Sequence, residues 1–220
     1  MIGHAKSTWG ILEENILQDA AVQNCLMAKP DFMINVALNN DKEIVKIFAG
    51  DVITAHREGC QFVKEHAMIK VDTLFDIVVT SNSGYPLDQN LYQTVKGMSA
   101  ASNIVRQDGI IIAASECSDG VPDHGNYGKI LAMRNTPQEL LEMISDPSFR
   151  LFDQWQVQKQ ASIQVKARCY LFSRLDDDTV KKAMLIPVKN LEQAINELLQ
   201  KNPGSKIAVL PMGPLTIPYI

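Results

Sequence analysis

The stretch Gly109–Ser115 (GIIIAAS) decides the fold, because five of its residues in a row are apolar and glycine precedes them. A short continuous apolar run is typical of a central parallel strand that is covered on both faces. A second run of this kind, Phe75–Thr80 (FDIVVT), lies upstream of it. A helical pattern from about Asp88 to Gln107 separates the two runs, and Asp108 precedes the glycine. Strand, helix and strand in this order predict a parallel β-α-β unit.

The alternation of strands and helices continues towards the C-terminus. We expect three more strands and three more helices, and the strands are expected at Cys169–Ser173, Met184–Pro187 and Lys206–Leu210. The helices are expected at Pro137–Ser145, Asp153–Val165 and Asn190–Lys201. This pattern predicts an α/β fold in which residues 72–220 form a three-layer domain with a mostly parallel sheet.

Residues 1–71 have a different pattern of predicted elements. Apolar residues at helical spacing predict a helix from about Gly10 to Lys29, and two strands, Asp31–Leu38 and Glu43–Phe48, flank a turn-like segment. A further helix from Asp51 to about Met68 follows, with Asp51 as its N-cap. We therefore expect a helix and a β-hairpin in a linking segment that precedes the larger domain.

Composition excludes several classes of protein. The chain has 220 residues, of which 46% are hydrophobic and 21% charged, and its net charge is −4. This balance is that of a globular protein, and the negative charge argues against nucleic acid as a partner. The longest apolar run is far shorter than the ~18 residues that span a bilayer, so no membrane partner is expected. The four cysteines form no CxxC pair, and we expect a cytoplasmic location.

One candidate binding site follows the strand Phe75–Thr80. Ligands bind beyond the carboxyl ends of the strands in open parallel sheets. Gln93 and Lys96 are three residues apart, and therefore share a face of the expected helix near that edge. An ammonium and an amide at this spacing suit a small carboxylate, and Tyr92 lies beside them. The alternative is that Gln93 and Lys96 form a solvated helix face and Tyr92 belongs to the core.

A second candidate is the loop Ser115–Gly125, which carries three carboxylates, a cysteine and a histidine. These groups suit a metal or acid–base chemistry, but no pair has the spacing of known ligands. The alternative is a purely architectural loop, in which Glu116 and Asp119 orient backbone amides. Trp155 is one of two tryptophans, and it is either a buried anchor or a ring that packs on a ligand. No dinucleotide fingerprint, P-loop or nucleophile elbow is present.

The run Asp76–Gly97 (DIVVTSNSGYPLDQNLYQTVKG) resembles the nickel-pincer-nucleotide lactate racemase family. Shorter matches follow the same order along the chain, at Ala49–Asp51, Glu116–Gly120 and Asp153–Trp155. The chain looks like the C-terminal half of such a racemase, with the segment that joins it to the N-terminal half.

The resemblance implies a function. Members of this family invert a 2-hydroxy acid by transferring a hydride to a nickel cofactor and returning it to the opposite face. The C-terminal domain closes over the site and binds substrate. Carried onto this sequence, Gln93 and Lys96 would hold the substrate carboxylate, with Tyr92 beside them and Trp155 nearby. The implied partners are a small 2-hydroxy acid and the N-terminal half of the enzyme.

The chain also departs from the family pattern. We find neither the Gly-Gly-x-Lys segment that carries the cofactor lysine nor the paired catalytic histidines, so no catalytic residue and no metal ligand is expected in this chain. The family's Gly-Asn-Pro segment is replaced by Glu14–Gln18. The alternative hypothesis is a non-catalytic α/β module that binds a small acid or a partner protein.

Overall fold

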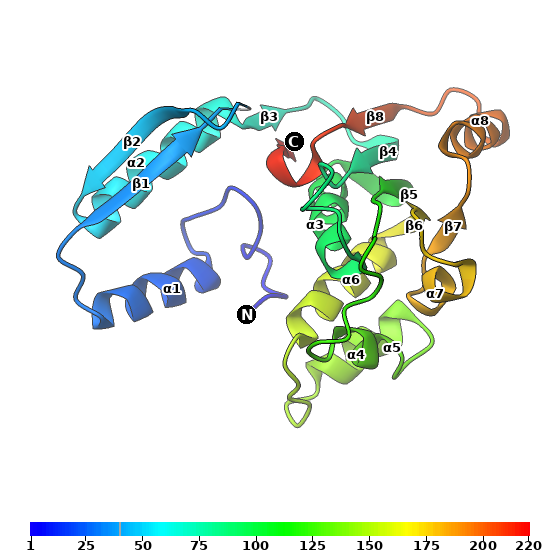
Figure 1. Cartoon of the computed structure of the whole chain (residues 1–220), viewed down its shortest axis with the longest axis horizontal. Helices are drawn as coiled ribbons and strands as arrows, with labels where there is room; N and C mark the ends of the chain where they lie inside the picture. The colour runs from blue at the N-terminus through cyan, green and yellow to red at the C-terminus, as the bar shows by residue number, and fades with distance from the viewer. Residues whose placement is uncertain (40) are drawn as a thin grey trace. The chain divides into compact units, whose positions relative to one another are not determined.

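The computed structural model describes residues 1–39 and 41–220 (Figure 1). The chain divides into two compact units, Met1–Met68 and Ile69–Ile220. The sequence pattern places this division between residues 71 and 72.

The first unit contains the expected helix, hairpin and second helix. Helix α1 spans Ile16–Met27, strand β1 spans Met33–Leu38, strand β2 spans Ile44–Gly50 and helix α2 spans Val52–His66. Strands β1 and β2 pair in antiparallel fashion, so the hairpin prediction is confirmed.

The N-caps of both helices are set by polar side chains. The expected N-cap of α2 is confirmed, because the carboxylate of Asp51 accepts a hydrogen bond from the Thr54 N–H. The expected start of α1 at Gly10 is wrong. The side chain of Asn15 accepts hydrogen bonds from the Leu17 and Gln18 N–H groups and starts the helix there.

The second unit is built on a five-stranded sheet. Its strands are β4 (Phe75–Ser81), β5 (Val105–Ala114), β6 (Ala167–Phe172), β7 (Ile186–Val188) and β8 (Ile207–Leu210). Their order across the sheet is β7-β6-β5-β4-β8, and every neighbouring pair is parallel. The predicted α/β fold with a parallel sheet is confirmed.

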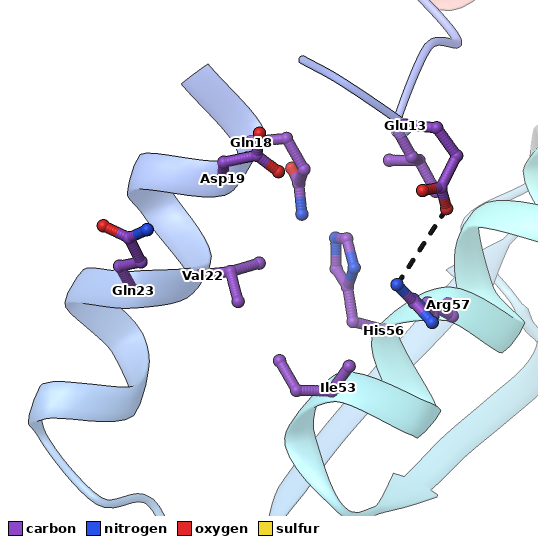
Figure 2. A pocket seen from close by; sticks show the side chains of 9 residues that line it. Glu13, Gln18, Asp19, Val22, Gln23, Ile53, His56 and Arg57 are labelled. Carbon is purple, nitrogen blue, oxygen red and sulfur yellow. Dashed lines mark ion pairs between the residues drawn. The ribbon is translucent and has the colours of Figure 1, made fainter. Parts of the chain in front are cut away.

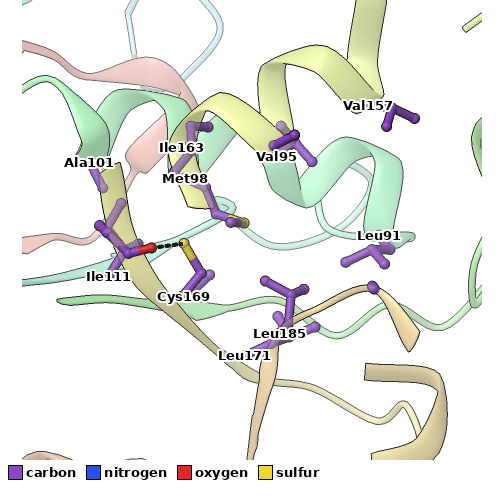
Figure 3. Packing of buried hydrophobic residues seen from close by; sticks show 14 of the residues in the cluster. Leu91, Val95, Met98, Ala101, Ile111, Val157, Ile163, Cys169, Leu171 and Leu185 are labelled. Atoms are coloured by element: carbon purple, nitrogen blue, oxygen red, sulfur yellow. Dashed lines mark hydrogen bonds between the residues drawn. The ribbon is translucent and has the colours of Figure 1, made fainter. Parts of the chain in front are cut away.

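Helices cover both faces of this sheet. Successive residues of β5 point to opposite faces. Ile111 packs in a core with residues of α3 (Leu91–Ser102) and α6 (Gln154–Lys166), as Figure 3 shows. Ile110 and Ile112 pack on the other face with residues of α8 (Leu191–Lys201). The three predicted layers are therefore present.

Shorter elements make up the remaining regular structure. They are α4 (Tyr127–Leu131), α5 (Pro137–Ser145), α7 (Asp177–Lys182), a 3₁₀ turn η1 (Gly213–Leu215), and the paired short strands β3 (Met68–Lys70) and β9 (Ile217–Tyr219). The sequence pattern predicts α5 but not α4, α7, η1, β3 or β9. Each of these unpredicted elements is six residues or shorter.

The expected helix from Asp88 to Gln107 is too long. Helix α3 ends at Ser102, and β5 begins at Val105. Val105 pairs with Phe75, and the Phe75 N–H donates to the carbonyl of Ile104 at 2.8 Å. Pairing with β4 therefore overrides the helical pattern of Ile104–Gln107.

The start of β4 carries a charged contact that links three strands. The two carboxylate oxygens of Asp76 accept hydrogen bonds from the Lys206 N–H at 2.8 Å and from Arg106 Nε at 2.6 Å. The Lys206 amide, followed by the Arg106 guanidinium, holds the pKa of Asp76 below its ordinary value. Asp76 therefore ties the edge strand β8 to β4 in its ionised form.

We expect Asp76→Asn to destabilise the protein near neutral pH, with a difference that shrinks in acid. Because the folded pKa lies below the unfolded value of 3.8, the stabilisation is present above that value and is lost as pH falls through the folded pKa. Urea midpoints at about pH 6 and about pH 3 measure this difference. The exposed Asp123→Asn variant is the control, and an equal gap at both pH values argues against the ion pair.

Candidate functional site

The N-terminal half of α3 lies beyond the carboxyl end of β4. The Gly97 N–H donates to the side chain of Asn82 at 3.0 Å, and Asn82 is the first residue after β4. A Cβ at Gly97 would lie 2.8 Å from the Ser81 carbonyl oxygen, so only glycine permits this approach without a shift. Since α3 passes the carboxyl end of β4 at Gly97, its residues Leu91–Lys96 lie where open parallel sheets bind ligands.

The strand order reverses at β4, beside the same carboxyl end. From β4 the chain leads through α3 to β5, while β8 returns on the other side of β4 after α8, which covers the opposite face. The 3₁₀ turn η1 packs at this point, because Gly213 lies against Thr80, Ser81 and Gly97. Helix α3 is therefore supported at the switch point on which α/β folds build ligand sites.

The loop between β4 and α3 is fixed by side-chain hydrogen bonds. The buried side chain of Asn82 donates to the Leu87 carbonyl. The carboxylate of Asp88 accepts from the Glu116 N–H at 3.1 Å, and its carbonyl accepts from the Cys117 N–H at 2.8 Å. Asn90 is the N-cap of α3 and accepts from the Gln93 N–H at 3.0 Å. The loops that follow β4 and β5 are thus joined into one scaffold.

Tyr92 and Trp155, which are distant in sequence, are brought together. The indole N–H of Trp155 donates to the Tyr92 hydroxyl at 3.3 Å, and Gln156 donates to the Tyr92 carbonyl at 2.6 Å. Tyr92 also packs edge-on against the buried ring of Tyr127, with centroids 5.3 Å apart. Trp155 is 36% exposed, so it is not the fully buried anchor that was the alternative.

Gln93 and Lys96 have free hydrogen-bonding capacity. The side-chain oxygen of Gln93 is buried and accepts no hydrogen bond within the described chain. Lys96 is exposed, and no ion pair joins it to another described residue. Two further buried oxygens of the preceding loop, on Ser83 and Asp88, also lack a partner among the residues described. Unpartnered buried polar atoms are costly, and these three lie within residues 83–93, in the loop after β4 and the first turn of α3.

Sequence reasoning missed Phe152 and Tyr127 as neighbours of this site. The Phe152 ring meets that of Trp155 edge-on, with centroids 4.8 Å apart, and it is 66% exposed. Phe152 lies three residues before Trp155, and this spacing was the available signal. Tyr127 offered no signal, because only the tertiary fold places its ring beneath Tyr92.

The loop Ser115–Gly125 has structural contacts throughout its first half. Glu116 forms an ion pair with Arg174 at 2.8 Å rather than orienting a backbone amide. The thiol of Cys117 is buried beside Thr94 and Ser115, and burial raises its pKa. A buried protonated thiol is a poor nucleophile. No three metal-binding side chains gather anywhere in residues 1–39 and 41–220.

A separate pocket lies within the first unit (Figure 2). It measures about 300 Å³ and is lined from α1 by Gln18, Asp19, Val22 and Gln23, from α2 by Ile53, His56 and Arg57, and by Leu12 and Glu13. Arg57 and Glu13 face each other at 3.9 Å across its rim. Its lining mixes both signs of charge.

None of the described helices is both long enough and apolar enough to cross a bilayer.

Comparison with known proteins gives one family. Residues 71–217 match the model of the lactate racemase C-terminal domain. Two relatives are named lactate racemase. The protein of Thermoanaerobacterium thermosaccharolyticum is 36% identical over 93% of this chain and 48% of its own length. The protein of Lactiplantibacillus plantarum is 36% identical over 96% of this chain and 50% of its own length. The chain thus spans about half the length of these relatives.

Solved structures agree with this assignment. The apoprotein of lactate racemase from T. thermosaccharolyticum superimposes on the whole chain with a TM-score of 0.93 and 33% identity, over 53% of its own length. A Thermotoga maritima protein at 11% identity covers 93% of this chain and 53% of its own, with a TM-score of 0.63, and shows the fold alone. On the sequence match and the first superposition, the chain belongs to the lactate racemase family and contains its C-terminal domain.

Proposed function

We propose that this chain is the part of a nickel-dependent lactate racemase that binds the carboxylate of a small 2-hydroxy acid. The observation that carries the proposal is the pairing of an exposed lysine without an ion pair, Lys96, with the buried and unpartnered amide oxygen of Gln93, one helical turn away. The racemase names of its relatives support the substrate class.

Each side chain has a distinct part in this proposal. Lys96 supplies the positive charge that a carboxylate needs in a closed site. Gln93 presents an amide N–H donor for the carboxylate. Because the Trp155 N–H can only donate, the Tyr92 oxygen accepts its hydrogen bond. The hydroxyl hydrogen of Tyr92 is then free for the substrate, and Trp155 orients it.

The rest of the racemase would have to supply the redox chemistry. A nickel-pincer nucleotide would provide the hydride acceptor when bound. The described residues do not fit this group, because no three metal-binding side chains gather among them. Cys60 Sγ and His56 Nε2 lie 3.5 Å apart, but no third metal-binding side chain of the described residues joins them. We therefore propose that the cofactor is held by the portion of the relatives that this chain does not match. All four cysteines are free thiols, which supports the proposed cytoplasmic location.

Gln93→Glu tests the assignment in the assembled, nickel-loaded racemase. The new carboxylate would face that of the substrate, and we expect kcat/KM for lactate to fall about 100-fold with unchanged nickel content. The matched control is Gln138→Glu, which makes the same change on the exposed face of α5. A Gln93→Glu enzyme with the kcat/KM of the Gln138→Glu enzyme would refute carboxylate binding at this helix.

A further inference from the structure

Phe152 is an exposed aromatic residue on a turn whose backbone is fixed by hydrogen bonds. The residue is 66% exposed. The Gln154 N–H donates to the Leu151 carbonyl at 3.2 Å, and the Leu151 N–H donates to the side-chain oxygen of Gln154 at 2.9 Å. These two reciprocal hydrogen bonds close the turn that carries Phe152. The ring of Phe152 therefore projects into solvent from a defined position.

Asp153 holds this turn against the rest of the second unit. Its φ is 72°, which lies in the left-handed region that few residues other than glycine adopt, although aspartate is enriched among them. Asp153 is buried, and its carboxylate accepts a hydrogen bond from the Asn126 N–H at 2.9 Å. Unusual backbone of this kind persists only where the surrounding structure fixes it, and it is frequent at functional sites. The buried contact of Asp153 thus determines where the neighbouring ring of Phe152 lies.

The ring of Phe152 lies beside the candidate site. It meets the Trp155 ring edge-on, with centroids 4.8 Å apart and an interplanar angle of 90°. The indole N–H of Trp155 in turn donates to the Tyr92 hydroxyl at 3.3 Å. We define the rings of Phe152 and Trp155 as the aromatic wall, and both residues keep exposed surface. The aromatic wall therefore begins at the hydroxyl group that we propose to face the substrate.

A 2-hydroxy acid needs an apolar surface in addition to polar partners. Its C2 atom carries a carboxylate, a hydroxyl group, a hydrogen and one variable substituent, which is a methyl group in lactate. The proposed function assigns the carboxylate to Lys96 and Gln93, and leaves the apolar substituent without a partner. Burial of that substituent against an apolar surface is favourable. Tyr127, the other ring that contacts Tyr92, is fully buried, so within this group of described rings the free apolar surface belongs to the aromatic wall.

We propose that the variable substituent of the substrate packs against the aromatic wall and that Phe152 limits the size of that substituent. The proposal rests on the proposed function, because carboxylate binding at Lys96 and Gln93 orients the substrate. The Trp155 ring is held by its hydrogen bond to Tyr92, so the space beside it depends on the residue at position 152. An apolar surface of this kind discriminates between substituents that differ by one methylene about 10- to 200-fold.

The test uses this chain assembled with the N-terminal portion of the T. thermosaccharolyticum racemase and loaded with the nickel cofactor. The substrates are L-lactate and L-2-hydroxybutanoate, which differ by one methylene group, and kcat/KM is measured for each. Phe152→Ala removes the ring from the aromatic wall, and Phe152→Tyr keeps a ring there. The matched control is Phe172→Ala, because Phe172 is 38% exposed and alternates along β6 with the core residue Leu171. Its side chain therefore lies on the sheet face opposite α3.

We expect Phe152→Ala to raise the ratio of kcat/KM for 2-hydroxybutanoate to kcat/KM for lactate about tenfold or more. Phe152→Tyr and Phe172→Ala should keep the ratio of the original chain. If Phe152 only supported Trp155, Phe152→Ala would lower both kcat/KM values by the same factor and leave their ratio unchanged. An unchanged or lower ratio in Phe152→Ala would therefore overturn the proposal.

The same measurements distinguish failure of this proposal from failure of the proposed function. If the original, nickel-loaded complex racemises neither acid, the proposed function is wrong, and so is the role of the aromatic wall. If that complex racemises lactate but Phe152→Ala keeps the original ratio, the proposed function stands and the size limit set by Phe152 is refuted.

Discussion

Replacing Lys96 by alanine is expected to lower kcat/KM for lactate by about 100-fold or more in the assembled, nickel-loaded racemase, which corresponds to about 2.7 kcal/mol of transition-state stabilisation. Lys96 lies on the turn of α3 next to Gly97, beyond the carboxyl end of β4, and no described residue forms an ion pair with it. Its positive charge is therefore available to a substrate carboxylate. Steady-state rates with both lactate enantiomers measure the loss.

Two further variants distinguish the loss of the Lys96 charge from a general loss of structure. Lys201→Ala removes an exposed lysine from the last turn of α8 and should leave the rates unchanged. Lys96→Arg keeps the charge but changes its geometry, so we expect it to retain more activity than Lys96→Ala. Nickel content should be equal in all forms. If Lys96→Ala turns over lactate at the rate of Lys201→Ala, Lys96 does not bind the substrate.

Gly213→Ala is expected to destabilise the second unit by about 1–3 kcal/mol. A Cβ at Gly213 would lie 2.5 Å from the carbonyl oxygen of Ser81 and would also collide with the side-chain oxygen of Thr80. The Cα of Gly97 lies 3.2 Å from the same point, so η1, β4 and α3 meet here without room for a methyl group. Ser81 ends β4, an interior strand of the sheet, so its carbonyl oxygen can move only if the carboxyl end of that strand moves.

Urea denaturation followed by a probe in the second unit measures this effect. The control is Gly59→Ala in α2, where a Cβ would meet only Phe48 at an ordinary 3.5 Å. There the greater helix propensity of alanine should stabilise the first unit by up to about 1 kcal/mol. Equal stability of Gly213→Ala and the original chain would show that η1 is loosely packed.

The sheet could be predicted from the sequence because its signal is local. The run Gly109–Ser115 is too apolar and too short for anything but a covered strand, and β5 does occupy the middle of the sheet with Ile111 on one face and Ile110 on the other. The start of β5 could not be predicted, since Val105 joins the sheet only through its pairing with Phe75. Contacts between distant residues, unlike periodicity, leave no trace in a short window.

The candidate site also has a part that could be predicted from the sequence and a part that could not. The spacing of Gln93 and Lys96 places them on one helix face whatever the tertiary structure, and the resemblance to racemases selects them. The contact of Trp155 with Tyr92 joins residues 63 positions apart, and only the packing of α6 against α3 produces it. The composition of the loop Ser115–Gly125 suits a metal or acid–base chemistry, but the ion pair of Glu116 with Arg174 depends on β6 and has no local signal.

The most direct test of the central claim is the conversion of L-lactate into D-lactate, followed by chiral chromatography. The sample is this chain joined with the N-terminal portion of a racemase and loaded with the nickel cofactor. We predict that the mixture approaches equal amounts of the two enantiomers, and that Lys96→Ala slows this approach about 100-fold at the same nickel content. If L-lactate stays unchanged in a loaded complex that is shown to be assembled, this chain is not the substrate-binding part of a lactate racemase.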